Sequence, residues 1–126
     1  MTKPILSALV VAHNEEAQLA DCLAQLGFAD ELVVVLDKCT DGSKAIAERF
    51  DAILVEGAWE IEGHRRNEGL DACIGAWILE VDADERANAA LGAEIRSAID
   101  GLSDGYFLLP FDNYIGERLV RHGWGG

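Results

Sequence analysis

The stretch ILSALVVA, residues 5–12, is an apolar run that only Ser7 interrupts, and it leads directly into the polar sequence HNEE at residues 13–16. A strand with one solvated face alternates polar and apolar residues, whereas a strand covered on both faces reads as a continuous apolar run. Further runs of this kind follow at residues 32–36, 53–55, 77–81 and 106–109. The sequence therefore predicts a set of buried strands.

The segments between these strands carry apolar residues at the spacing of a helix. Leu19, Cys22 and Leu23, for example, lie at positions i, i+3 and i+4. Asn14 and the segment TDGS at 40–43 stand where the first two helices are expected to be capped. Strands that begin about 20 to 30 residues apart leave room for one crossover helix each, which makes neighbouring strands parallel. We therefore expect an α/β fold in which helices cover both faces of a mostly parallel sheet.

The composition limits the kinds of partner. The chain has 126 residues, of which 10 are Lys or Arg and 23 are Asp or Glu, so its formal net charge is −13. Half of the residues are hydrophobic, which is enough for one packed domain. A surface of this charge repels phosphate polymers, so we expect no nucleic-acid partner. An anionic ligand would need a bound cation or a few well-placed arginines.

Cysteine usage and hydropathy favour an intracellular protein. Cys22, Cys39 and Cys73 form no C-x-x-C pair, and their odd number cannot close a disulfide framework. The apolar run at residues 5–12 is too interrupted for a signal peptide. No apolar stretch approaches the roughly 18 residues of a membrane span. The sequence thus predicts a soluble, cytoplasmic chain with reduced thiols.

The most informative polar sequence is DADE, residues 82–85, which follows the apolar run at 77–81. Ligands of open α/β sheets bind beyond the carboxyl ends of the strands. In an extended backbone Asp82 and Asp84 point to the same side, where two carboxylates repel each other unless a cation lies beside them. Hard oxygen ligands suit Mg²⁺ or Mn²⁺, and such an ion can bridge the oxygens of a diphosphate. The alternative is a solvated turn whose acids precede a helix.

Other polar residues near the strand ends leave a choice of roles. Asp37 ends the second run, where a carboxylate can accept from a nucleobase or a ribose hydroxyl, or can cap the turn that follows. Arg65 and Arg66 are adjacent and suit a phosphate, although a surface pair that balances neighbouring acids explains them as well. His13 either faces a nucleotide or simply ends a strand.

Taken together, these segments resemble glycosyltransferase family 2, the inverting nucleotide-sugar transferases of the Rossmann-like GT-A fold. The similarity covers nearly the whole chain and rests on motifs in a fixed order. They are VVAHNEE (10–16), LVVVLD (32–37) with TDGS (40–43), RN (66–67) with GL (69–70), and WILEVDADER (77–86). The tail, with NYIG at 113–116 and RHGW at 121–124, resembles the branch that includes lipopolysaccharide-core glucosyltransferases.

The resemblance implies a role for each matching residue. The uridine diphosphate (UDP) part of the donor is expected to contact the first loop, the end of the second strand, the third helix and the D-x-D pair: Ala12, His13, Asn14, Glu15, Asp37, Arg66 and Asp82. Asp82 and Asp84 are expected to hold Mg²⁺ or Mn²⁺. An acceptor hydroxyl then displaces UDP from the anomeric carbon while the metal takes up the diphosphate charge. The family's general base comes from an acceptor-binding half that this sequence does not match, so no catalytic base is assigned.

The resemblance also sets expectations about domains and partners. Residues 1–110 are expected to form the nucleotide-sugar-binding domain, and residues 111–126 to begin the acceptor side as a loop. Family catalytic domains continue further, so we expect a truncated reading frame or a fragment. The implied acceptor is a glycan or glycolipid of the bacterial envelope, with a peripheral association of the full-length protein at the inner membrane.

Two alternative functions stay open. One is a truncated, non-catalytic remnant that binds a nucleotide sugar without transferring it. The other is a nucleotidyltransferase, which is expected to carry a glycine-rich loop after the first strand, where this sequence has HNEE. The G-x-G-x-x-G and G-x-x-x-x-G-K-[ST] phosphate-binding motifs are also missing from that position.

Overall fold

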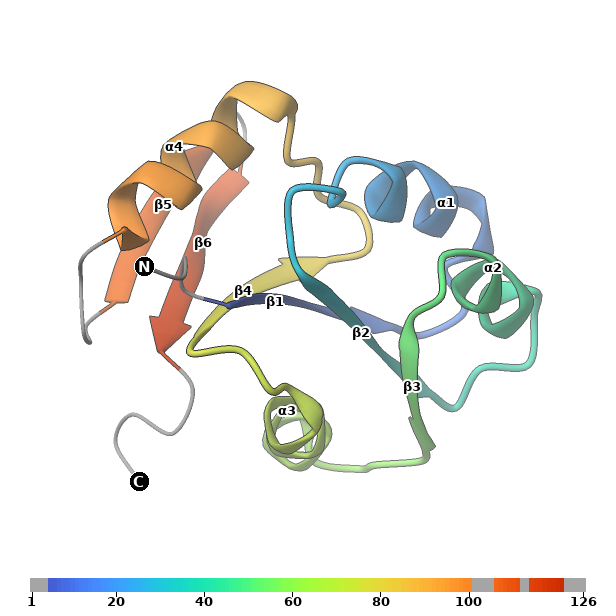
Figure 1. Cartoon of the computed structure of the whole chain (residues 1–126). Helices are drawn as coiled ribbons and strands as arrows, with labels where there is room; N and C mark the ends of the chain where they lie inside the picture. Colours follow the sequence, from blue (N-terminus) through green and yellow to red (C-terminus); the bar gives the residue numbers. More distant parts are fainter. Residues whose placement is uncertain (1–4, 101–105, 112–113, 122–126) are drawn as a thin grey trace.

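The computed structural model describes residues 5–100, 106–111 and 114–121 (Figure 1). Strands and helices alternate as far as α4, and each strand predicted from an apolar run is present. In chain order the elements are β1 (Leu6–Ala12), α1 (Glu16–Ala24), β2 (Glu31–Asp37), α2 (Ser43–Arg49), β3 (Ile53–Gly57), α3 (Glu62–Ala72), β4 (Trp77–Asp82), α4 (Ala89–Ile99), β5 (Tyr106–Phe111) and β6 (Tyr114–Arg121). Within these ranges no helix could span a bilayer, since the longest two, α3 and α4, have 11 residues each.

The strands form one sheet in the order β3-β2-β1-β4-β6-β5. β1 pairs in parallel with β2 and β4, and β3 extends the parallel part beyond β2. β6 is antiparallel to both β4 and β5. A parallel neighbour requires a crossover, which α1, α2 and α3 supply. The prediction of an α/β fold with a mostly parallel sheet is confirmed.

Helices cover both faces of the sheet (Figure 1). α3 lies against one face, where Leu9, Val33 and Val35 form a small core with Cys73 and Ile78. α1, α2 and α4 lie over the other face, on a larger core. Alternate residues of a strand point to opposite faces, and six of the seven residues of β1 are buried. This is why the run at residues 5–12 shows no polar alternation.

One expectation about the tail is wrong. The sequence predicts a loop over residues 111–126, but Tyr114–Arg121 forms β6. The strand lies between β4 and β5, with Leu119 opposite Leu79 of β4. The glycine and the charged residues of this segment are typical of a loop. The edge of β4 offers backbone hydrogen-bond partners, and only the tertiary structure reveals them. The division of the chain at residue 110 stays a prediction.

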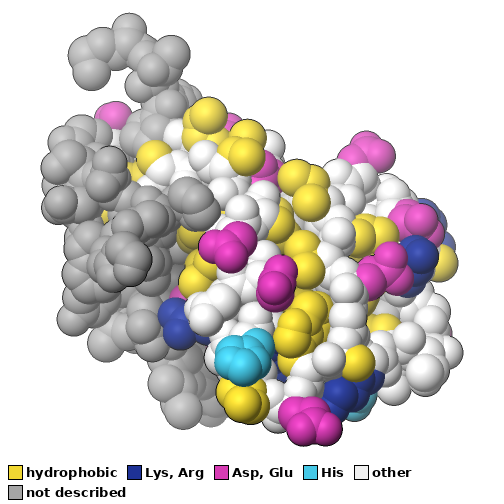
Figure 2. Space-filling model, turned by 90° about the horizontal axis from the view of Figure 1, so that it is seen from below, with side chains coloured by type: hydrophobic (Ala, Val, Ile, Leu, Met, Phe, Trp, Pro, Cys, Tyr) yellow, Lys and Arg dark blue, Asp and Glu magenta, His cyan; other side chains and the backbone are white. Residues whose placement is uncertain are grey.

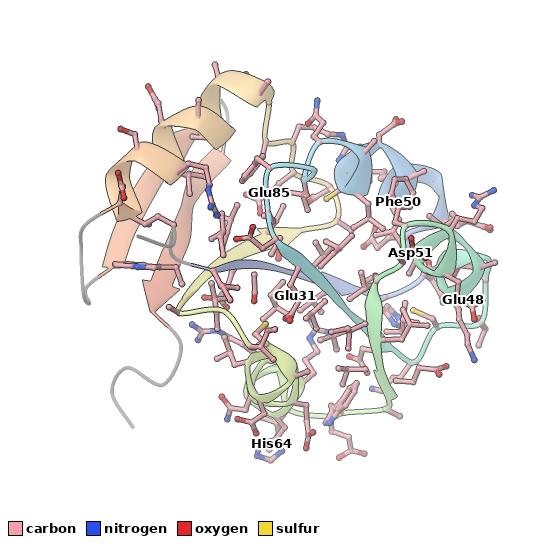
Figure 3. All side chains as sticks on the ribbon, viewed as in Figure 1. Glu31, Glu48, Phe50, Asp51, His64 and Glu85 are labelled. Carbon is pink, nitrogen blue, oxygen red and sulfur yellow. The ribbon has the colours of Figure 1, made fainter. Side chains whose placement is uncertain are left out.

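A polar cluster ties the turn before β4 to the strands beside it. The buried Ser7 hydroxyl donates to Glu31 Oε1 at 3.1 Å and accepts from the backbone N–H of Gly75 at 2.9 Å. Glu31 Oε1 also accepts from the N–H of Ile74 at 3.1 Å. Glu31 lies on the side of the sheet that α3 covers (Figure 3). The turn from α3 into β4 is therefore held by side chains of β1 and β2.

Candidate functional site

The polar residues that follow β1, β2 and β4 meet at one edge of the sheet, because the carboxyl ends of parallel neighbours lie together. Two hollows open at this edge. The acidic hollow, about 220 Å³, is lined by Val11, His13, Glu15, Arg65, Asp82, Ala83 and Asp84. The arginine hollow, about 160 Å³, is lined by Leu9, Val11, Arg65, Arg66, Glu80, Val81 and Asp82. Val11, Arg65 and Asp82 thus line both hollows.

The loop after β1 is tied to the loop after β2. Asn14 has a φ of 52°, in the left-handed region that asparagine tolerates better than most residues. Its Oδ1 accepts from the backbone N–H groups of Thr40 and Asp41, at 2.7 and 3.2 Å. His13 Nδ1 lies 2.7 Å from the carbonyl oxygen of the last residue of β2. Asn14 therefore holds the second loop instead of capping α1, whose N-cap is Glu15.

The first turns of α1 and α2 hold each other as well. The backbone N–H of Glu15 donates to Ser43 Oγ, and that of Glu16 donates to Asp41 Oδ2, both at 3.1 Å. In the other direction, the N–H of Gly42 donates to Glu16 Oε2 at 3.1 Å. These bonds satisfy backbone donors that the start of a helix leaves unpaired. These hydrogen bonds thus hold the loop after β1, which is predicted to bind the nucleotide, in place at the edge of the sheet.

Asp37, the last residue of β2, is 3% exposed. Its Oδ1 accepts from the backbone N–H of Trp59 at 3.0 Å, and its Oδ2 accepts from Arg65 Nη1 at 2.7 Å. Burial by itself raises the pKa of a carboxyl group, but the hydrogen bonds from Arg65 and Trp59 and the nearby positive charges outweigh it, so the pKa of Asp37 is lowered. Asp37 is a charged carboxylate at the sheet edge, and no motif in the sequence announces its pairing with Arg65.

The two adjacent arginines of α3 reach different strands. Arg65 binds Asp37 at the end of β2, whereas Arg66 makes two hydrogen bonds to Glu80 on β4, from Nε at 2.5 Å and from Nη2 at 2.9 Å. Neighbouring residues of a helix are turned by about 100° around its axis, so the two side chains point in different directions. The phosphate contact predicted for Arg66 thus competes with Glu80.

Acidic side chains are scattered over the face shown in Figure 2, with basic ones between them. Positive charge beside an anionic ligand must therefore come from individual arginines. Arg65 is the arginine that lines both hollows, while Arg66 lines the arginine hollow. The family resemblance assigns the nucleotide contact to Arg66, whereas the structure places Arg65 in both hollows.

Asp82 and Asp84 are exposed and line the acidic hollow together, while Ala83 between them is buried. Glu85, which is 8% exposed, closes the turn (Figure 3): its Oε1 accepts from the N–H of Asp82 at 2.8 Å, and its own N–H donates to the Asp82 carbonyl oxygen at 2.9 Å. Partial burial and the carboxylates of Glu85 and Asp84 raise the pKa of Asp82, and Arg65 opposes them. Neighbours that oppose the ionisation of a carboxylate favour a bound cation.

The acidic hollow presents the carboxylates of Asp82 and Asp84, and carboxylate oxygens are ligands that Mg²⁺ and Mn²⁺ prefer. Among the side chains that the structure describes, no three His, Cys, Asp or Glu residues converge to hold a metal. Mg²⁺ usually keeps several waters and is bound through one or two carboxylates together with substrate phosphates. The exposed oxygens of Asp82 and Asp84 fit that pattern. Their role as metal ligands stays a prediction.

Comparison with known proteins identifies relatives. The family model for glycosyl transferase family 2 matches residues 7–120. The lipopolysaccharide core biosynthesis glycosyltransferase LpsC of Rhizobium meliloti (strain 1021) is 30% identical over 125 residues, covering 92% of this chain and 42% of LpsC. An uncharacterized glycosyltransferase of Rickettsia bellii (strain RML369-C) is 33% identical over 96 residues, covering 75% of this chain and 32% of that protein. The chain spans less than half the length of these relatives.

Solved structures share the architecture. S. aureus TarS 1–349 in complex with UDP-GlcNAc gives a TM-score of 0.70 at 26% identity, over 84% of this chain and 34% of the TarS chain. The mannosyltransferase PcManGT from Pyrobaculum calidifontis, in complex with GDP-Man and Mn²⁺, gives a TM-score of 0.75 at 20% identity, over 95% of this chain and 45% of that chain. The second likeness shows the fold alone. The family model matches this chain over residues 7–120, and its sheet is that of a GT-A glycosyltransferase. This chain therefore belongs to glycosyltransferase family 2.

Proposed function

We propose that this chain is the nucleotide-sugar-binding part of a glycosyltransferase that moves a sugar from a UDP-sugar to an acceptor hydroxyl, with inversion at the anomeric carbon. Membership of the family and the likeness to LpsC support the transferase and a role in bacterial envelope polysaccharide or lipopolysaccharide synthesis. TarS was solved with UDP-GlcNAc, which supports a UDP-sugar as the donor.

The acidic hollow is the observation on which this proposal rests. It brings the exposed carboxylates of Asp82 and Asp84 together with Arg65. β2 and β4 flank β1, so the carboxyl end of β1 lies between Asp37 and Asp82. A nucleoside that lies at Asp37 and the loop after β1 would have its diphosphate in the acidic hollow.

Each residue at this edge has a proposed role. The nucleoside lies against the loop after β1, formed by Ala12, His13, Asn14 and Glu15. Asp37 accepts a hydrogen bond from the nucleoside, and Arg66, held by Glu80, adds positive charge in the adjoining hollow. Asp82 and Asp84 would hold Mg²⁺ or Mn²⁺, and Asp82 also lies near the ribose. The bound ion would neutralise charge that develops on UDP as it leaves.

The acceptor is proposed to be a glycan or glycolipid, in line with the relative LpsC. Its hydroxyl oxygen bonds to the anomeric carbon as the bond to UDP breaks, and a base takes the hydroxyl proton. No residue in the described part of the chain is assigned as that base. We also propose a cytoplasmic location, with the longer protein associated peripherally with the inner membrane.

Calorimetric titration with UDP, with and without Mn²⁺, tests the site. We expect Mn²⁺ to tighten UDP binding by the wild-type chain by about tenfold, an ordinary coupling between two ligands. The double substitution Asp82→Asn/Asp84→Asn should remove this dependence, because neutral amides attract the cation weakly. Asp21→Asn, a matched change of an exposed acid on α1, should leave the dependence intact.

Other outcomes would count against the assignment. UDP binding that ignores both the metal and the double substitution contradicts the site. Metal-dependent UDP binding by a longer protein that never releases UDP from a UDP-sugar favours the non-catalytic remnant. Release of pyrophosphate from a nucleoside triphosphate favours the nucleotidyltransferase.

A further inference from the structure

The carboxylate of Asp37 is covered. The residue is 3% exposed, with Arg65 Nη1 at 2.7 Å from Oδ2 and the backbone N–H of Trp59 at 3.0 Å from Oδ1. Under the proposed function, a nucleoside donates a hydrogen bond to this carboxylate. A ligand cannot reach oxygens that are buried in this way unless one of the two partners moves.

Arg65 is the partner that is able to move. Trp59 contributes a backbone N–H, and its side chain fills the space beside Gly57 and packs against the small core under α3. Arg65 contributes the end of a long side chain that is 23% exposed. Rotation about side-chain torsions shifts a guanidinium group without any change in the backbone.

A diphosphate in the acidic hollow would give the guanidinium group of Arg65 an alternative partner. Arg65 lines the acidic hollow, where the diphosphate is proposed to lie against Asp82 and Asp84. Guanidinium groups bind phosphate oxygens through paired, charge-assisted hydrogen bonds, so a diphosphate can replace the Asp37 carboxylate. Arg66 is less suited to this exchange, because it is not among the residues that line the acidic hollow.

We propose that Arg65 couples the two ends of the nucleotide. Its guanidinium group covers Asp37 in this structure, passes to the diphosphate when a nucleoside diphosphate binds, and thereby opens Asp37 to the nucleoside. The exchange rests on the proposed function, since it needs the nucleoside at Asp37 and the diphosphate in the acidic hollow. It changes hydrogen bonds and an ion pair but no covalent bond.

This exchange makes the two parts of the ligand bind cooperatively. A nucleoside alone must separate Arg65 from Asp37 and offers the guanidinium group no anion in return. Pyrophosphate offers one, so a nucleoside that arrives afterwards meets an open carboxylate. The coupling is reciprocal, as any coupling between two binding equilibria must be. An arginine that stayed on Asp37, or one that only added positive charge, would give no such coupling.

Uridine titrations of the wild-type chain test the exchange, in Mn²⁺ with and without saturating inorganic pyrophosphate. We expect pyrophosphate to lower the Kd of uridine by about tenfold. In Arg65→Gln the Kd of uridine should not depend on pyrophosphate, and UDP should bind about tenfold more weakly because the diphosphate loses a charged donor. Arg49→Gln removes the same charge from an exposed position in α2 and should keep both properties.

Thermal unfolding shows whether each variant is folded. If Arg65→Gln does not fold, the effect of pyrophosphate on the uridine Kd of the wild-type chain tests the exchange. Arg65→Lys keeps the charge but lacks the planar guanidinium group, so pyrophosphate should lower its uridine Kd less than in the wild type. A wild-type uridine Kd that pyrophosphate leaves unchanged overturns the exchange, while metal-dependent UDP binding in the same samples still supports the proposed function. A wild-type chain that does not bind UDP contradicts both.

Discussion

Replacing Asp37 by alanine should lower the free energy of unfolding by about 3 kcal/mol. The substitution removes the carboxylate that Arg65 binds and the acceptor of the Trp59 N–H. The Asp37 side chain is 5% exposed, so water replaces the lost bonds poorly. Urea denaturation followed by circular dichroism measures the change.

The difference in unfolding free energy between the wild-type chain and Asp37→Ala should depend on pH. The pKa of Asp37 is lowered from its ordinary value of 3.8 in the folded chain. A group with a depressed folded pKa adds stability above its unfolded pKa and loses it as the pH falls through the folded pKa. The difference in unfolding free energy between wild type and Asp37→Ala should therefore hold from neutral pH to roughly pH 5 and shrink below 3.8.

Asp21→Ala is the control, since it removes an exposed carboxylate from α1. We expect it to change the unfolding free energy by no more than about 0.5 kcal/mol. An equally small loss for Asp37→Ala would contradict the buried ion pair. So would a difference between wild type and Asp37→Ala that persists unchanged into strong acid.

Gly75→Ala should be similarly destabilising, at roughly 3 kcal/mol. A methyl group on residue 75 would lie 2.5 Å from the Ser7 hydroxyl oxygen, 2.7 Å from the Ser7 backbone nitrogen and 2.8 Å from the Trp77 carbonyl oxygen. Two of these atoms belong to the backbone of β1 and β4, so no side-chain rotation relieves the overlap. A shift of the turn would also break the hydrogen bond from the Gly75 N–H to Ser7.

Thermal unfolding measures this effect, because a loss of that size lowers the Tm of a domain of this length by about 10 °C. Gly63→Ala is the matched control: Gly63 lies in the first turn of α3, and an added methyl group there meets no atom within 4 Å. That variant should keep or slightly raise the Tm, since alanine favours a helix. If Gly75→Ala and Gly63→Ala have the same Tm, the turn at residue 75 accommodates a methyl group more easily than its contacts indicate.

The sequence by itself determined the parallel part of the sheet, and it predicts the edge at which we propose that ligands bind. Buried parallel strands must be largely apolar on both faces, so β1, β2 and β4 are visible without any tertiary information as apolar runs that only Ser7 and Glu80 interrupt. The polar residues after them follow from the same rule, because strands that run in parallel end at one edge. Asp82 and Asp84 are accordingly exposed in one hollow, as their spacing predicts.

Only the tertiary structure decided which residues at that edge contact one another. Arg65 and Asp37 are 28 positions apart, and Arg66 and Glu80 are 14 positions apart. Which arginine reaches which carboxylate depends on how α3 is rotated about its own axis against the sheet, and neighbouring residues cannot specify that rotation. β6 shows the same limit, because its place in the sheet depends on pairing with the distant β4 as well as with the neighbouring β5.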